Sequence, residues 1–191
     1  MYIVFEGIVG TGKTTQSKRL VKYLKEQHKK KVIWTREPGG TEIAEAIRKL
    51  VQGTKFKEKM DPICDHYLYA AARAQSLSKI VKPSLKSKKF VVSDRSFISA
   101  LVRDIETKKA LKINAAAIEN LLPDLIFYIK LDPETGLSRI KDGDNDKFER
   151  KGIAFYKKIN KGYELVSRMR MFKGKWINID GRGSEDEVFK K

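Results

Sequence analysis

The sequence predicts a doubly wound α/β fold, with a five-stranded parallel sheet flanked by helices. Short runs of β-branched and aromatic residues alternate along the chain with longer amphipathic runs, a pattern typical of a parallel sheet covered by helices. A glycine-rich segment follows the first strand directly and leads into the first helix. Because ligands of such folds bind at the carboxyl ends of the strands, we expect the functional residues in the loops that follow them.

The predicted strands cover residues 2–5, 31–35, 90–93, 125–131 and 175–179. The second to fourth strands contain near-continuous apolar runs, as expected of strands that are buried on both faces. The helices between them are predicted to begin near Lys13, Thr41, Asp61, Phe97, Asn114, Pro133, Lys151 and Glu185. Asp61-Pro62 is a strong start signal, because aspartate caps the amino end of a helix and proline suits its first position.

The helix that begins near Asp61 is predicted to bury one apolar stripe against the core. The stripe consists of Ile63, Tyr67, Ala70, Ala74 and Leu77. The single cysteine of the chain, Cys64, lies in the same helix with no His or Cys at metal-ligand spacing. We therefore interpret Cys64 as a core residue.

The composition indicates a single cytoplasmic domain that spans residues 1–191. The chain has no apolar stretch long enough to cross a bilayer, no export signal at its start, and one cysteine, which cannot form an internal disulfide. Its net charge is +17, but the lysines are dispersed and no arginine-rich helix or RNA-binding aromatic motif appears. We interpret the charge as a lysine-rich surface that attracts anionic nucleotides, and we expect neither a membrane nor a nucleic acid as partner.

The segment after the first strand matches the phosphate-binding pattern G-x-x-x-x-G-K-[ST]. It comprises Gly7, Ile8, Val9, Gly10, Thr11, Gly12, Lys13 and Thr14. The glycines allow successive backbone N–H groups to point at phosphate oxygens, at the positive end of the following helix. Lys13 is expected to neutralise the β- and γ-phosphates of ATP, and Thr14 to coordinate Mg²⁺. A glycine-rich turn that binds nothing would not explain Gly-Lys-Thr at a helix start.

Further segments occur along the chain in a fixed order. They are Thr35-Arg36-Glu37-Pro38-Gly39-Gly40-Thr41, Tyr69-Ala70-Ala71-Ala72-Arg73-Ala74-Gln75, Asp94-Arg95, Pro123-Asp124-Leu125, Leu131-Asp132-Pro133-Glu134 with Arg139, Asp146-Lys147-Phe148-Glu149 and Ile179-Asp180. Together with Phe5-Glu6-Gly7 and the phosphate-binding segment, they resemble the thymidylate kinase family of P-loop nucleoside monophosphate kinases over nearly the whole chain. The resemblance implies ATP-dependent phosphorylation of dTMP to dTDP in deoxynucleotide biosynthesis, with Mg²⁺ and a homodimeric assembly. It also adds Thr15 to the ATP-binding residues.

Asp94 and Arg95 follow the third strand, which lies beside the phosphate-binding loop in such a sheet. We expect Arg95 to be catalytic and to bridge the donor and acceptor phosphates, because a guanidinium binds phosphate oxygens through two parallel donors. Asp94 is expected to hold Mg²⁺ through water or to orient Arg95. The alternative is a surface ion pair at the end of the strand.

Tyr69 and Arg73 lie four residues apart and share one helix face. A ring beside a guanidinium suits a nucleotide base, which by the resemblance is thymine; for Tyr69 the alternative is a half-buried core position. The remaining acceptor-binding candidates are Arg36, Glu37, Pro38, Arg48, Arg95, Ser99 and Arg103. Arg48 is the weakest of them, since an arginine on a helix is usually solvated.

Residues 141–149 are polar and contain glycine between two helical patterns. They fit a lid that closes over ATP and excludes water, in which Lys147 or Lys141 reaches the transferred phosphoryl group. An exposed turn fits this composition equally well.

Several positions depart from the family pattern. Val9 replaces an acidic residue of the phosphate-binding loop, and Ser96 replaces an aromatic residue. Arg103-Asp104 replaces Tyr-Gln near the base and sugar, and Lys147 stands where lid arginines are usual. Three consequences remain open: weaker selection against a 2′-hydroxyl, a shifted base preference, or mutual compensation in which Asp104 replaces the lost carboxylate.

Two other functions remain open from the sequence. Asp94-Arg95-Ser96 also resembles deoxynucleoside kinases, in which Glu37 would be the base that deprotonates a sugar hydroxyl. The Gly39-Gly40-Thr41 and Pro123-Asp124 segments argue against that class. A non-catalytic P-loop module that binds nucleic acid through its basic surface is the third possibility, and it predicts salt-sensitive binding without nucleotide phosphorylation.

Overall fold

A computed structural model describes residues 1–53, 56–104, 109–140 and 151–191 of the chain. Five strands form one sheet in the order β2-β3-β1-β4-β5, and every neighbouring pair is parallel. The strands are β1 (Tyr2–Glu6), β2 (Val32–Arg36), β3 (Phe90–Asp94), β4 (Leu125–Lys130) and β5 (Trp176–Asp180). The predicted fold class is confirmed, and each strand end lies within one residue of its predicted position.

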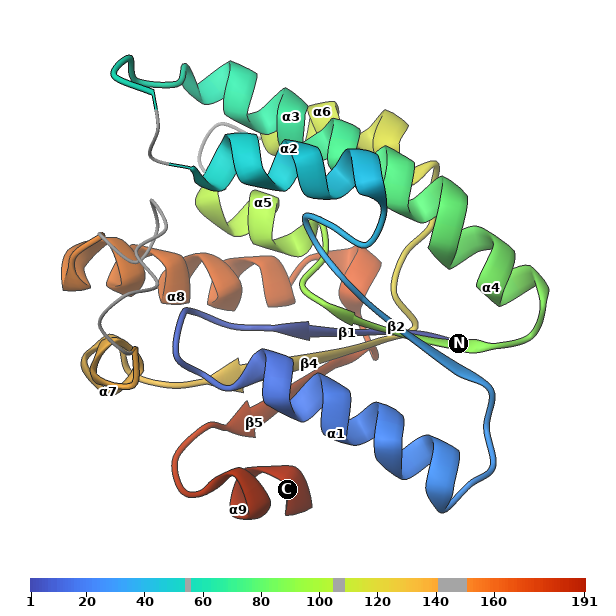
Figure 1. Cartoon of the computed structure of the whole chain (residues 1–191). Helices are drawn as coiled ribbons and strands as arrows, with labels where there is room; N and C mark the ends of the chain where they lie inside the picture. Colours follow the sequence, from blue (N-terminus) through green and yellow to red (C-terminus); the bar gives the residue numbers. More distant parts are fainter. Residues whose placement is uncertain (54–55, 105–108, 141–150) are drawn as a thin grey trace.

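Helices flank the sheet on both faces (Figure 1). Those described are α1 (Lys13–Glu26), α2 (Glu42–Gln52), α3 (Pro62–Ser76), the π-helical η1 (Leu77–Val81), α4 (Lys82–Lys86), α5 (Ile98–Arg103), α6 (Lys109–Ile118), α7 (Pro133–Ser138), α8 (Ile153–Ser167), the 3-10 turn η2 (Arg170–Phe172) and α9 (Glu185–Lys190). The prediction of a helix start at Asn114 is wrong, because Asn114 lies inside α6. The sequence also gave no sign that α3 continues through η1 into α4, where the Lys82 N–H binds the Leu77 carbonyl oxygen.

The central strand β1 is buried on both faces, because its residues alternate between two hydrophobic clusters. Tyr2 and Val4 belong to the larger cluster, which includes residues of α5 and α8. Ile3 and Phe5 point the other way and pack with Val21 of α1. The carboxyl end of β1, where the phosphate-binding loop starts, is therefore anchored in the middle of the molecule. Within the described ranges, no helix is long and apolar enough to cross a membrane.

Helix α3 buries a different face from the predicted stripe. Its exposed residues include Ile63, Cys64, Tyr67 and Ala74, and Tyr67 is 60% exposed. Its inward face instead carries Asp65, His66, Tyr69, Arg73 and Ser76. The stripe and the core position of Cys64 are thus wrong predictions, although Ala70 and Leu77 are buried. The physical reason is that α3 turns polar residues inward, so its burial does not follow hydrophobicity.

Candidate active site

One cavity of about 900 Å³ lies at the carboxyl ends of the strands. Its lining gathers segments far apart in the sequence: residues 7–15 and 36–38, Arg48, Tyr69, Arg73, Asp94, Arg95, Ser99 and Arg103. Every described residue that the sequence predicts for ATP, acceptor or metal binding is therefore in this lining. Lys147, Lys141 and the rest of the predicted lid lie outside the described residues.

The phosphate-binding loop turns from β1 into α1 around this cavity. Gly10 and Gly12 have φ angles of 73° and 83°, in the left-handed region that glycine adopts without steric cost. A Cβ atom at Gly10 would lie 1.8 Å from the Gly136 carbonyl oxygen of α7, so only glycine fits there. Helix α1 has no side-chain cap at Gly12, which leaves the N–H groups of its first turn for phosphate oxygens.

Lys13, the first residue of α1, is buried. Its Nζ donates to the carbonyl oxygen of Ile8 and to Thr11 Oγ1, the latter at 3.2 Å. Burial and then the Arg95 charge lower the pKa of Lys13 from 10.5 to about 7, while Asp94 and Glu6 act in the opposite direction. The ammonium therefore lacks a full countercharge, which a bound phosphate supplies.

Phosphate binding at Lys13 is expected to take up a proton at alkaline pH. Lys13 titrates near neutrality in the empty protein, whereas a bound phosphate favours its charged form. The affinity for ATP should therefore fall as the pH rises above 7, by up to ~tenfold per pH unit. Calorimetry of ATP binding at pH 8, in two buffers of different ionisation enthalpy, measures the uptake, because ATP itself is already deprotonated there.

Lys13→Met is the matched control, since it keeps an unbranched stem and removes the titrating group. Residual ATP binding by this variant should show no proton uptake at pH 8. A wild-type protein that takes up no proton at that pH would show that Lys13 stays charged in the empty site.

Thr14 and Asp94 bring a hydroxyl and a carboxylate together beside the phosphate-binding loop. Thr14 Oγ1 donates to Asp94 Oδ2, and Asp94 lies at the end of β3, opposite Phe5 of β1. The second carboxylate oxygen, Asp94 Oδ1, is buried and has no hydrogen-bond partner among the described residues. Hard cations prefer oxygen ligands of this kind, so these residues fit a Mg²⁺ ion.

Arg95 follows β3 in a strained backbone conformation, with φ 72°. Its N–H donates to the Phe5 carbonyl oxygen at 2.9 Å, and its Nη1 donates to the Gly7 carbonyl oxygen at 3.0 Å and to Ser99 Oγ at 3.2 Å. Burial opposes its charge, but Tyr163, Asp94 and Glu6 outweigh burial and keep the pKa of Arg95 above its ordinary value. Strain of this kind concentrates at functional sites, and here it places a charged guanidinium against the phosphate-binding loop.

The arginines of the cavity divide by whether a carboxylate already neutralises them. Arg36 pairs with Glu45 at 2.8 Å, Arg73 with Glu37 at 2.6 Å, and Arg103 with Asp65 at 2.9 Å. Arg48 instead donates to the Pro38 carbonyl oxygen at 2.9 Å, and no carboxylate ion pair is found for Arg48 or Arg95 among the described residues. Burial and then the Arg36 charge lower the pKa of Arg48. Arg48 and Arg95 therefore carry the positive charge best placed for an acceptor phosphate.

Tyr69 and Arg73 line the cavity and are nevertheless buried. Arg73 is 3% exposed and donates to Glu37 Oε2 and to Asn114 Oδ1. The Arg103 guanidinium lies 4.6 Å from the centre of the Tyr69 ring. For Tyr69, burial and a place in the cavity wall occur together, so the two interpretations from the sequence do not exclude each other. Asn114 is not among the site residues predicted from the sequence, where its one signal is an amide in an otherwise apolar helical run.

Three departures from the family pattern have different surroundings. Val9 packs against the larger hydrophobic cluster, and Ser96 is buried, with its N–H and Oγ donating to Glu6 Oε1 at 2.8 Å each. Asp104 Oδ2 accepts from the Ala110 N–H at 2.9 Å. Asp104 is not among the described residues that line the cavity, which weakens the idea that it replaces the lost carboxylate.

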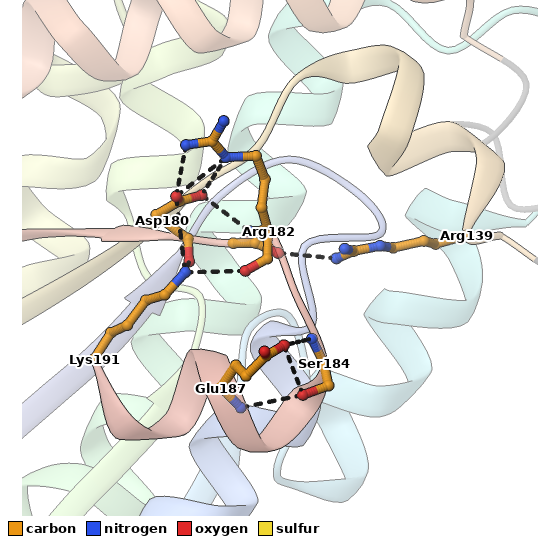
Figure 2. A network of polar contacts seen from close by, with 7 residues as sticks. Arg139, Asp180, Arg182, Ser184, Glu187 and Lys191 are labelled. Atoms are coloured by element: carbon orange, nitrogen blue, oxygen red, sulfur yellow. Dashed lines mark hydrogen bonds and ion pairs between the residues drawn. The ribbon is translucent and has the colours of Figure 1, made fainter.

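The loop after β5 forms one wall of the cavity. Gly181, Gly183 and Ser184 line it, and Figure 2 shows the polar contacts that hold this loop. Asp180 pairs with Arg182 at 2.8 Å, and this hydrogen-bonded pair lowers the pKa of Asp180. The Ser184–Glu187 capping box starts α9, and Arg139 donates to the Gly181 carbonyl oxygen at 3.1 Å. The loop is therefore fixed from α7, β5 and α9.

Comparison with known proteins gives one consistent result. A family model described as thymidylate kinase matches residues 5–191. The thymidylate kinase of Caldicellulosiruptor saccharolyticus is 39% identical over 196 residues, covering 100% of this chain and 92% of that protein. That of Lactobacillus acidophilus is 37% identical, covering 100% and 90%, and that of Ligilactobacillus salivarius is 40% identical, covering 85% and 81%. The chain belongs to the thymidylate kinase family.

Proposed function

We propose that this chain transfers the γ-phosphoryl group of ATP to a phosphate oxygen of dTMP, releasing ADP and dTDP. One observation carries the proposal: Arg95 donates both to Gly7 of the phosphate-binding loop and to Ser99 of the predicted acceptor site. A single guanidinium thus joins the donor and acceptor parts of one cavity. The whole chain, residues 1–191, would act as one kinase domain in the cytoplasm, where both nucleotides are found.

The residues of the cavity have separate roles in an in-line transfer. The loop amides and Lys13 bind the β- and γ-phosphates, while Thr14 and Asp94 would hold Mg²⁺, which neutralises phosphate charge when bound. Arg48 and Arg95 bind the acceptor phosphate. As the phosphoryl group moves, Arg95 stays in contact with it, so catalysis is mainly positioning and charge stabilisation. Tyr69 and Arg73 would face the thymine base, and Lys147 or Lys141 would approach the migrating group.

Acceptor choice is the direct test of this function. ADP release is measured with dTMP, dUMP, dCMP, dGMP, UMP and thymidine, with Lys13→Ala as the inactive control. The highest kcat/KM is expected for dTMP. A higher value for thymidine would favour a deoxynucleoside kinase, although Glu37, the base that such an enzyme needs, is buried and bound to Arg73. No turnover with any acceptor, together with salt-sensitive DNA binding, would favour the nucleic-acid module.

The homodimer also remains a proposal, supported by an apolar surface on α2 and α3. These helices pack side by side (Figure 1), and their large exposed apolar residues are Ile43, Leu50, Ile63 and Tyr67. Ile43 and Leu50 lie seven apart on α2, and Ile63 and Tyr67 four apart on α3, so each pair shares one helix face. Exposed apolar patches of this kind mark association sites.

Tyr67→Asp is expected to convert the proposed dimer into a monomer, because it places a charge within the proposed apolar contact. Sedimentation velocity measures the change. Leu165→Asp is the control, since Leu165 is an exposed apolar residue on α8. A wild-type protein that sediments as a monomer at high concentration would overturn the proposal.

A further inference from the structure

Glu6 is a fully buried carboxylate at the last position of β1. It is 0% exposed and directly precedes Gly7 of the phosphate-binding loop, yet it is not among the described residues that line the cavity. A buried carboxylate is costly unless several hydrogen bonds compensate it, and an apolar residue of similar size would usually be as stable in the same place. The position of Glu6 therefore calls for an explanation beyond packing.

Four hydrogen bonds hold the Glu6 carboxylate. Oε1 accepts from the N–H and Oγ of Ser96, at 2.8 Å each. Oε2 accepts from Ser99 Oγ at 2.6 Å and from Tyr163 OH at 2.9 Å. The donors come from the loop after β3, from α5 and from α8, so Glu6 joins three elements to the end of β1. Ser96, a departure from the family pattern, supplies two of the four bonds.

Ser99 connects this carboxylate to Arg95. Ser99 Oγ donates to Glu6 Oε2, so the single hydroxyl proton of Ser99 points to Glu6. The lone pairs of Ser99 Oγ are then available to Arg95 Nη1, which donates to it at 3.2 Å. The second acceptor of Arg95 Nη1 is the carbonyl oxygen of Gly7, the residue after Glu6. Both contacts that orient the guanidinium therefore depend on the position of Glu6.

We propose that Glu6 is a positioning residue for phosphoryl transfer, which acts through Ser99 to hold the Arg95 guanidinium against the phosphate-binding loop. Glu6 would thereby set kcat without contacting either nucleotide. The inference rests on the proposed function only in that Arg95 takes part in the transfer; the orientation of Arg95 can be measured without turnover.

Glu6→Gln is the sharpest change, because the geometry fixes which way the new amide must point. The Ser96 N–H can only donate, so the amide oxygen has to face Ser96 and the NH₂ group has to face Ser99 and Tyr163. Ser99 Oγ then uses one lone pair to accept from the amide, and its proton, which no longer has a carboxylate acceptor, can turn toward Arg95. The contact of Arg95 Nη1 with Ser99 is weakened, its contact with the Gly7 carbonyl oxygen remains, and the shape of the side chain at position 6 is kept.

Side-chain NMR of Arg95 tests the positioning itself. In the wild type we expect resolved Nη signals, because two acceptors restrict rotation of the guanidinium, and Arg95→Lys assigns these signals by removing them. In Glu6→Gln the signals should merge through faster rotation. Tyr128→Phe is the matched control, since it removes a hydroxyl from the ring stacked 4.6 Å from Tyr163 and leaves the Glu6 contacts intact. Unchanged Arg95 signals in Glu6→Gln would overturn the inference.

A double-mutant cycle then tests whether Glu6 acts through Arg95. Glu6→Gln should lower kcat by ~10- to 100-fold, the size of effect that misplacement of a catalytic group produces, with the KM for ATP within ~twofold. In an Arg95→Lys background the same change should cost less than ~twofold. If the double variant loses the full product of the two single losses in kcat, Glu6 does not act through Arg95.

If Glu6→Gln does not fold, Ser99→Ala breaks the same link between Glu6 and Arg95 and leaves the other contacts of Glu6. The same outcomes then apply to Ser99→Ala. An inactive wild type would refute the proposed function, whereas the NMR comparison would still decide on Glu6.

Discussion

Replacing Lys13 by alanine is expected to lower kcat about a thousandfold or more, the scale of effect seen when a cation that neutralises a migrating phosphoryl group is removed. Lys13 is 7% exposed at the first turn of α1, and in the empty protein it donates to Ile8 and Thr11 of its own loop. Phosphate must displace these contacts, so the ammonium moves from weak neutral acceptors to charged ones. The gain is larger for the transition state, where negative charge develops on the leaving oxygen. Single-turnover measurement of dTDP formation at saturating ATP isolates this step.

The stability of the variants separates lost catalysis from lost structure. The pKa of Lys13 is about 7 in the native state and 10.5 ordinarily, so the unfolded state binds more protons between these values. The wild-type free energy of unfolding should therefore rise as the pH increases from 7 to about 10, and Lys13→Met should lack this contribution. Below pH 7, where the buried ammonium is fully charged, Lys13→Met should be more stable than the wild type. A Lys13→Ala protein that melts well below the wild type at pH 6 would mean that its inactivity reflects unfolding.

The features that the sequence predicted well depend on neighbouring residues. A strand such as β1 is recognised by its apolar run. The phosphate-binding loop is recognised by glycines at fixed spacing before Lys13 and Thr14. The loop works through its own backbone, so nothing distant is needed to recognise it. The same holds for α3, whose start at Asp61-Pro62 is a local capping signal. All of these could be assigned from short windows of sequence.

The features that were missed depend on residues far away in the chain. Glu6 finds its partners 90 and 157 residues later, in Ser96 and Tyr163, and Asn114 binds Arg73 from 41 residues away. Hydrophobic periodicity along the sequence does not predict such a long-range hydrogen bond. The same cause explains the error on α3, where Arg73 faces inward because Glu37 and Asn114 lie there to receive it. Burial in a cavity wall is decided by tertiary partners, whereas hydrophobic periodicity describes only an apolar core.

Arg95→Ala is the second change with a large expected effect, a loss in kcat of about a thousandfold with the KM for ATP changed only a few-fold. The large effect on kcat and the small effect on the KM for ATP follow from where Arg95 lies. In the proposed mechanism Lys13 and the loop amides bind ATP, whereas Arg95, which donates to Gly7 and Ser99, meets the donor phosphate only as transfer begins. Arg95→Lys should recover little of the loss, because an ammonium lacks the planar fork that binds two oxygens at once. Steady-state kinetics with dTMP and ATP varied separately measures both constants.

Arg95→Gly is a second control, because it removes both the side chain and the backbone strain at this position. The φ angle of 72° at Arg95 costs a residue with a Cβ atom roughly 1 kcal/mol, and glycine adopts it freely. Arg95→Gly should therefore be as inactive as Arg95→Ala but more stable by about 1 kcal/mol in urea unfolding. Equal stability of the two variants would show that the loop after β3 relaxes when the arginine is removed. A kcat for either variant within tenfold of the wild type would mean that Arg48 and Lys13 carry the transfer without Arg95, and that its strained backbone serves the fold.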